Sequence, residues 1–338
     1  MKMESAIKRT GTINTSRKTI RIYLILFIAC IFLFSCASRN TARAEEYFSI
    51  GMAYFDMGKY AEAEQWLNRA VAMDKTMTAS EYNLGRISFE RGRYDEAVLH
   101  FENVLIKDPD NVMALKAAAY SQIKNRNLEK AEAHYNRVLE LVPESVDDGY
   151  NYALVLYGLS KYETCEIVLN KYPFALKENA PSILLLARAQ KAQNKVEAAD
   201  SYDKWLIAAG TPGAQGLYEY AQVLESAGLY ARALEQYKAA INALTEDTKE
   251  LRKSKIRFEE ARLIMIADPE NEEGISELNL AVSEGFMDTA AVEDLLLDER
   301  ITQANKDEIK NTINVIKNKD KPPEESKKTE EDNSQPAS

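Results

Sequence analysis

Residues 78–111 read TASEYNLGRISFERGRYDEAVLHFENVLIKDPDN, and this stretch sets the register of most of the chain. Gly85 and Gly92 within it stand 34 residues after Gly51 and Gly58. Further matches at the same spacing are Tyr60 with Tyr94, Ala63 with Ala97, Ala97 with Ala131, and Phe101 with Tyr135. A fixed period of this length indicates stacked supersecondary units, each of which buries its apolar face on the next.

Each unit is expected to form two antiparallel helices. Two helices approach closely only where side chains are small, so glycine or alanine recurs at the crossing points, and bulky residues at helical spacing fill the space on either side. Gly58, Gly92 and Gly228 fall between the two helices of a unit, where a left-handed backbone favours glycine. Pro109 and Pro143 close a unit, because proline cannot continue the interior of a helix.

These residues resemble the tetratricopeptide repeat (TPR), whose pattern is W-x2-L-G-x2-Y, then A-x3-F, then P. The unit 78–111 carries this pattern with Leu84-Gly85, Ala97, Phe101 and Pro109. The resemblance implies an all-α fold, a TPR-type α-solenoid in which antiparallel helix pairs form a right-handed superhelix. The expected solenoid covers residues 44–286, with units at 44–77, 78–111, 112–145, 146–179, 180–213 and 214–247 and a degenerate unit at 248–286.

The fourth and fifth units match the pattern less well than their neighbours. The fourth has Ala153, Cys165 and Leu169 in the repeat positions, and the fifth is slipped by one residue at Ala198 and Tyr202. The sequence leaves open whether these two units divide the superhelix into two lobes.

The C-terminal part resembles a terminal motif of some bacterial TPR proteins. Leu278, Ala281 and Gly285-Phe286 form an L-x2-A-x3-G-F pattern, and an L-x2-D segment ending at Asp298 follows it. Solenoid ends need a cap with a polar outer face, so residues 287–318 are expected to form capping helices. Residues 319–338 consist mainly of Lys, Glu, Pro, Ser and Asn without aromatic residues, which predicts a disordered charged tail.

The charge is distributed unevenly along the chain. The formal net charge is −10, but residues 1–35 contain six cations and one acid, so they carry +5 and the remainder carries −15. An acidic body argues against nucleic acid as a partner, because nucleic-acid binding needs clustered Lys and Arg. A glycine-rich phosphate loop is absent from the sequence.

The N-terminal segment has the features of a signal peptide. Its basic segment is followed by an apolar run of 13 residues, from Ile22 to Phe34. A membrane-spanning helix needs about 20 apolar residues, so the run fits a signal-peptide core better than a span. Residues 1–35 are therefore expected to be removed in the mature protein.

The end of this run, Leu33-Phe34-Ser35-Cys36, resembles the lipobox of bacterial lipoproteins. The resemblance implies that the Cys36 thiol is acylated, that cleavage occurs just before it, and that residues 36–43 form the lipidated start and a short linker. Cys30 is a poorer second candidate because an aromatic residue stands three positions before it. Ala37 after the cysteine favours the outer membrane, with the repeats facing the periplasm. An uncleaved signal anchor is the alternative.

The resemblance also implies which residues line the concave groove, because in TPR proteins the first helix of each unit faces it. Carried over by position, the groove residues are Phe48, Met52, Phe55, Tyr82, Arg86, Phe89, Lys116, Tyr120, Lys124, Tyr150, Tyr157, Arg188 and Tyr218. Aromatic residues with interspersed cations are typical of protein-binding hot spots. The alternative is that these aromatic side chains pack against neighbouring helices.

The remaining cysteine and histidine side chains do not indicate a catalytic site or a metal site. After cleavage Cys165 is the one cysteine left, in a small-residue position of the fourth unit, which predicts a buried structural role. His100 and His134 occupy equivalent positions of adjacent units, but two ligands without a third make a weak metal site. The sequence shows no catalytic constellation, so we expect no enzyme activity, no cofactor and no metal.

The sequence therefore predicts a bacterial lipoprotein, anchored in the cell envelope through Cys36, that acts as a scaffold or adaptor for other envelope proteins. Two alternatives remain. One is a transport accessory that docks a solute-binding protein or holds a small apolar ligand. The other is a structural lipoprotein that associates with itself as a homo-oligomer.

Overall fold

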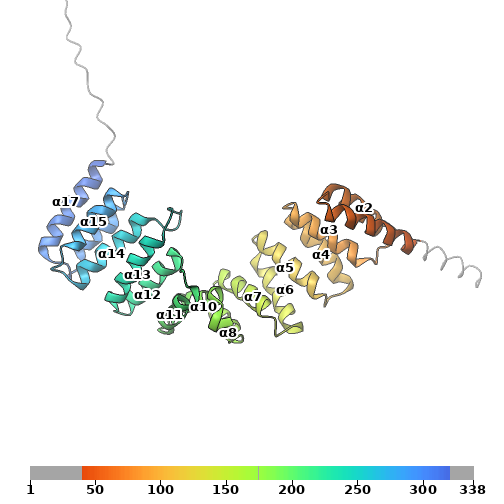
Figure 1. Cartoon of the computed structure of the whole chain (residues 1–338), viewed down its shortest axis with the longest axis horizontal. Coiled ribbons are helices and arrows are strands. Elements are labelled where there is room, and N and C mark those ends of the chain that lie inside the picture. Colours follow the sequence, from red (N-terminus) through yellow and green to blue (C-terminus); the bar gives the residue numbers. More distant parts are fainter. Residues whose placement is uncertain (1–39, 174, 320–338) are drawn as a thin grey trace, which may run out of the picture. The chain divides into compact units, whose positions relative to one another are not determined.

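The computed structural model describes residues 40–173 and 175–319, and within these ranges the chain forms helices and turns without any strand (Figure 1). The helices follow one another as antiparallel pairs, which confirms the all-α TPR-like solenoid. The chain divides into two compact units, the first ending at Val168 and the second beginning at Leu169. The boundary falls within the second helix of the fourth repeat.

The first unit contains four helix pairs. They are the helix at 40–56 with α2 (Tyr60–Met73), α3 (Thr78–Glu90) with α4 (Tyr94–Lys107), α5 (Val112–Lys124) with α6 (Leu128–Leu141), and α7 (Val146–Gly158) with α8 (Tyr162–Asn170). The second unit continues with α9 (Ala175–Glu178), α10 (Ala180–Ala192), α11 (Glu197–Ala209), α12 (Ala214–Ser226), α13 (Tyr230–Ala243), α14 (Lys253–Ala267), α15 (Glu273–Ser283), α16 (Thr289–Asp294), η1 (Leu295–Leu297) and α17 (Gln303–Lys319). First helices begin at residues 78, 112, 146, 180 and 214, so the 34-residue period persists through the weak fourth and fifth repeats.

A small residue in each first helix lets the second helix approach closely. The buried residues at this position are Gly51, Gly85, Ala119, Ala153, Ala187 and Ala221. The second helix fills the space with a bulky side chain; a Cβ on Gly85 would lie 2.6 Å from Cε1 of Phe101. Ala97 of the same second helix is also fully buried. The spacing of small and large residues in the sequence therefore sets the helix contact within each repeat.

The turn between the two helices of a repeat contains one residue with a positive φ at every 34th position. These residues are Gly58 (71°), Gly92 (72°), Arg126 (59°), Ser160 (58°), Asn194 (55°) and Gly228 (74°). In the second repeat the Gly92 N–H donates to the Phe89 carbonyl at 2.9 Å, and the next N–H donates to the Ser88 carbonyl at 2.8 Å. The turn geometry is thus kept even where the residue is not glycine.

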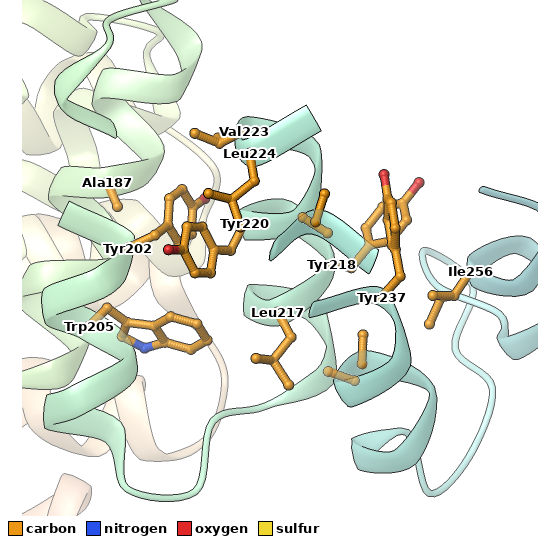
Figure 2. Packing of buried hydrophobic residues seen from close by; sticks show 14 of the residues in the cluster. Ala187, Tyr202, Trp205, Leu217, Tyr218, Tyr220, Val223, Leu224, Tyr237 and Ile256 are labelled. Carbon is orange, nitrogen blue, oxygen red and sulfur yellow. The ribbon is translucent and has the colours of Figure 1, made fainter. Parts of the chain in front are cut away.

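Five aromatic side chains lie in one core cluster of the second unit (Figure 2). Tyr202 of α11 stacks on Tyr220 of α12 with ring centroids 5.4 Å apart. Trp205, one turn further along α11, lies beside Leu217 in Figure 2, and its ring occupies the space that a Cβ on Gly216 would need. The one-residue slip in the fifth repeat is visible here, because α11 buries Ala198 and Tyr202, 33 residues after the buried Cys165 and Leu169 of α8.

The seventh helix pair begins later than the period predicts. α14 starts at Lys253, five residues after the expected 248, because a loop at 244–252 precedes it. Phe258 of α14 stacks on Phe286 with ring centroids 4.3 Å apart. The helix α17 then covers this end of the unit, with Ile309, Ile313 and Ile316 buried in the same cluster.

Two boundaries differ from the sequence-based expectation. The first helix already includes residues 40–43, which we expected in the linker, because this stretch contains no proline or glycine and leads into the fully buried Ala44. At the other end α17 includes Lys319, the first residue of the expected tail. The expected signal peptide, Cys36 and residues 320–338 lie outside the described residues.

Replacing Gly92 with alanine and Arg126 with glycine should change stability in opposite directions. No atom lies within 4 Å of the Cβ position at Gly92, so alanine there costs the left-handed backbone penalty alone, about 1 kcal/mol. Arg126→Gly removes the same penalty and should raise the free energy of unfolding by about 0.5 kcal/mol, because part of the gain is offset by the chain entropy of glycine. Urea unfolding followed by circular dichroism measures both changes.

Arg126→Ala is the matched control, because it removes the side chain but keeps a Cβ on a left-handed backbone. It should leave stability close to that of the wild type. Equal stabilisation by alanine and glycine at this position would show that the backbone conformation is not the cause.

Candidate protein-binding groove

Positions on successive first helices meet at a spacing of 31 residues, because each repeat stacks on the next with a small offset. Phe55 meets Arg86, and Phe89 meets Tyr120. In the second unit Lys191 meets Gln222 at the same spacing. The sequence pattern gives the 34-residue period but not this lateral contact, which depends on how the helices stack.

In the first unit these contacts bring together three rings and two cations, which we call the aromatic–cation row: Phe55, Arg86, Phe89, Tyr120 and Lys124. The Arg86 guanidinium carbon lies 4.4 Å from the Phe55 ring centroid. The Phe89 and Tyr120 centroids are 5.2 Å apart, and the Lys124 ammonium lies 5.3 Å from the Tyr120 centroid. Tyr120 is 46% exposed, so the row presents ring surface to solvent.

A second set of aromatic contacts, within the first, second and fourth repeats, holds two of these rings and Tyr157. Phe55 packs against Tyr60 with centroids 5.5 Å apart, and Phe89 packs against Tyr94 at 5.3 Å. In the fourth repeat Tyr157 packs against Tyr162 at 5.3 Å. Each pair joins the end of a first helix to the start of the second helix, so the rings are fixed before any partner arrives.

Other predicted groove residues have structural partners in their own unit. The Lys116 ammonium lies 2.8 Å from Oδ1 of Asp148, whose side chain is 3% exposed. Tyr82 packs against Phe101, and Phe48 packs against the core of the first repeats. Met52, Tyr150 and Tyr157 are half-buried.

The second unit does not carry an aromatic groove as predicted. Tyr218 is 6% exposed and packs against Tyr237, so its assignment to the groove is wrong; the ring belongs to the core. Arg188 donates from Nε to Glu219 at 2.7 Å. This part of the face is therefore built from polar contacts instead of exposed rings.

The cysteine and the two histidines considered in the sequence analysis are buried or contact neighbouring side chains. Cys165 is fully buried, and burial raises the pKa of its thiol to about 12. His100 Nδ1 lies 2.9 Å from Glu81, and His134 Nδ1 lies 3.0 Å from Gln122. The part of the chain that the structure describes contains no cluster of three or more His, Cys, Asp or Glu side chains suited to a metal ion.

Across residues 40–173 and 175–319, none of the helices combines the length and the apolar character that crossing a membrane requires.

Comparison with known proteins agrees with this architecture. Two family models, both described as tetratricopeptide repeat, match residues 44–76 and 82–146. A lipoprotein of Treponema pallidum (strain Nichols) is 24% identical over 164 residues, which cover 48% of this chain and 84% of that protein.

Two solved structures share the fold. A tetratricopeptide repeat protein from Parabacteroides merdae has a TM-score of 0.51 at 20% identity, over 76% of this chain and all of that one. Pseudomonas aeruginosa pilF has a TM-score of 0.50 at 16% identity, over 66% of this chain and 98% of its own. The chain therefore contains tetratricopeptide repeats, and such domains generally bind peptide or protein partners.

Removing the Lys116 ammonium should destabilise the protein more than removing the Arg86 guanidinium. Lys116→Met leaves the Asp148 carboxylate buried without its counterion, which should cost about 1–3 kcal/mol. Arg86 is exposed and its contacts are with the Phe55 ring and the Asn83 amide, so Arg86→Met should cost below about 1 kcal/mol. Urea unfolding of both variants at one pH tests the difference, and equal losses would contradict a structural role for Lys116.

Proposed function

We propose that this chain is a membrane-anchored scaffold whose first unit binds an extended segment of another envelope protein along the aromatic–cation row. The observation that carries this proposal is the row itself, in which Phe55, Arg86, Phe89, Tyr120 and Lys124 lie on three successive first helices. The proposal includes no catalytic activity, because tetratricopeptide scaffolds are typically not enzymes.

The chemistry of the row suits a peptide. Tyrosine and arginine are enriched among the residues that dominate binding energy at protein interfaces. Arg86 and Lys124 lie over ring faces, where a cation–π contact supports each cation and still leaves hydrogen-bond donors for a partner's carbonyls or carboxylates.

The Phe55 and Phe89 rings are also preorganised for binding. Phe55 and Phe89 are held by Tyr60 and Tyr94 of their own repeats, so their orientation is set in the free protein. These rings then lose less side-chain entropy when a partner binds than freely rotating rings would. The packing of these aromatic residues against neighbouring helices therefore supports a binding surface instead of replacing it.

The envelope location rests on the N-terminal sequence. We propose that residues 1–35 are cleaved, that Cys36 is lipidated, and that the repeats face the periplasm from the outer membrane. The similarity to the Treponema pallidum lipoprotein, which spans 84% of that protein, supports an association with the envelope. More than one acyl chain is needed for stable anchoring, which the diacylglycerol modification of lipoproteins provides.

Alanine at Phe55, Phe89 and Tyr120 together should remove partner capture. We expect at least a tenfold loss of the protein that is crosslinked to the wild-type chain in native cells and identified by mass spectrometry, because two or more hot-spot contacts are removed. The matched control is Leu99→Ala with Ile106→Ala, which removes two side chains that are 61% and 78% exposed outside the row.

Circular dichroism and urea unfolding must first show that both variants are folded. If the row variant captures the same proteins in the same amounts as the wild type and the control, the row does not bind the partner.

Cys36→Ala should abolish lipid attachment. Cells fed labelled palmitate should incorporate label into the wild-type chain and into Cys30→Ala, but not into Cys36→Ala, because acylation needs the thiol of the mature first residue. Label on Cys36→Ala equal to that on the wild type would overturn the assignment. A wild-type chain that stays unlabelled and uncleaved in the membrane would instead identify an uncleaved signal anchor.

A further inference from the structure

The second unit contains a cavity of about 430 Å³ between the end of α10, the start of α11 and α12. Lys191, Lys195, Val196, Ala199, Gln222 and Val223 are among its lining residues. Val223 is labelled in Figure 2, at the end of α12 beside Leu224. The cavity is of the size at which proteins bind small ligands or single side chains.

The cavity lies in the fifth repeat, between two helices that an aromatic pair joins in some of the other repeats. In the first, second and fourth repeats an aromatic pair joins the two helices, as Tyr157 and Tyr162 do with centroids 5.3 Å apart. The residues 34 positions later are Lys191 and Val196, so no ring is supplied. Val196 is 86% exposed, and its neighbour in the cavity wall, Ala199, is too small to fill the space.

The charge of Lys191 is not balanced by an ion pair. Its ammonium donates to the Gln222 side-chain oxygen at 2.7 Å, and among the described residues no carboxylate lies within 4.0 Å of it. The nearby Glu219 is engaged by Arg188 at 2.7 Å. Burial lowers the pKa of Lys191 more than the Glu219 carboxylate raises it. An incoming anion would therefore be stabilised by a partly desolvated cation.

We propose that this cavity binds an aromatic ring that carries a carboxylate. The ring takes the place of the missing aromatic pair, against Val196, Ala199 and Val223, and the carboxylate accepts hydrogen bonds from the Lys191 ammonium. Two sources share this chemistry. One is a free arylcarboxylic acid, and the other is the C-terminal residue of a peptide that ends in an aromatic amino acid.

The proposal does not depend on the aromatic–cation row. All its residues belong to the second unit, so loss of partner capture in the row variant would leave this site unaffected. The two hypotheses therefore fail independently.

The experiment uses the full chain in detergent and measures binding by titration calorimetry and saturation-transfer NMR. The probes are phenylacetate, its neutral amide phenylacetamide, acetate, and the peptide Gly-Gly-Phe with a free or an amidated C-terminus. We expect phenylacetate or the free-acid peptide to bind at least tenfold more tightly than its amide, and acetate to bind at least tenfold more weakly than phenylacetate. Tighter binding of phenylacetate identifies a small acid as the ligand, and tighter binding of the peptide identifies a chain end.

Two variants test the two halves of the site. Lys191→Met should remove the preference for acid over amide, and Ala199→Phe should fill the cavity and reduce all binding at least tenfold. Ile207→Phe is the control, because it adds a ring at a position of α11 that is 83% exposed and outside the cavity. Equal affinity for acid and amide in the wild type, or unchanged acid preference in Lys191→Met, would overturn the proposal. The lysine variant decides the question even if Ala199→Phe does not fold.

Discussion

In each repeat the first helix carries a glycine or alanine at the point where the second helix crosses it, and a large side chain of the second helix occupies the vacated space. Gly85 receives the Phe101 ring in this way, and Gly216 makes room for Trp205 where α12 meets α11. Because close packing leaves no room for an extra methyl group, this contact determines the helix spacing within a repeat. The spacing in turn determines which residues of neighbouring repeats can touch.

The lateral contact between repeats is the place where the two units differ in chemistry. The same 31-residue pairing joins Phe55 to Arg86 and Phe89 to Tyr120 in the first unit, but Lys191 to Gln222 in the second. Rings and cations favour a peptide, whereas an ammonium beside a cavity favours an anion. One architecture therefore presents two kinds of surface.

Much of the fold could be predicted because its determinants are local in sequence. The spacing of small and bulky residues indicated the helix pairs, and the one-residue slip at Ala198 and Tyr202 appears in the structure as the burial of these two residues of α11. The five-residue displacement of α14 could not be foreseen, because the loop before it has no repeat signal. Tyr218 was assigned to the groove by its position, yet it is buried, since its ring packs against Tyr237 of the second helix of the same repeat.

The sequence by itself determined the period, the small-residue crossings and the left-handed turns at its glycines, because each of these follows from the size or the backbone freedom of individual residues. Only the tertiary structure decided that Arg126, Ser160 and Asn194 adopt the same left-handed conformation, since asparagine merely tolerates it and the packing of the flanking helices imposes it on arginine and serine. It also decided that Lys116 forms an ion pair with the buried Asp148, and that Lys191 and Val196 line a cavity. Those outcomes depend on side chains brought together from adjacent repeats, which no spacing within one repeat specifies.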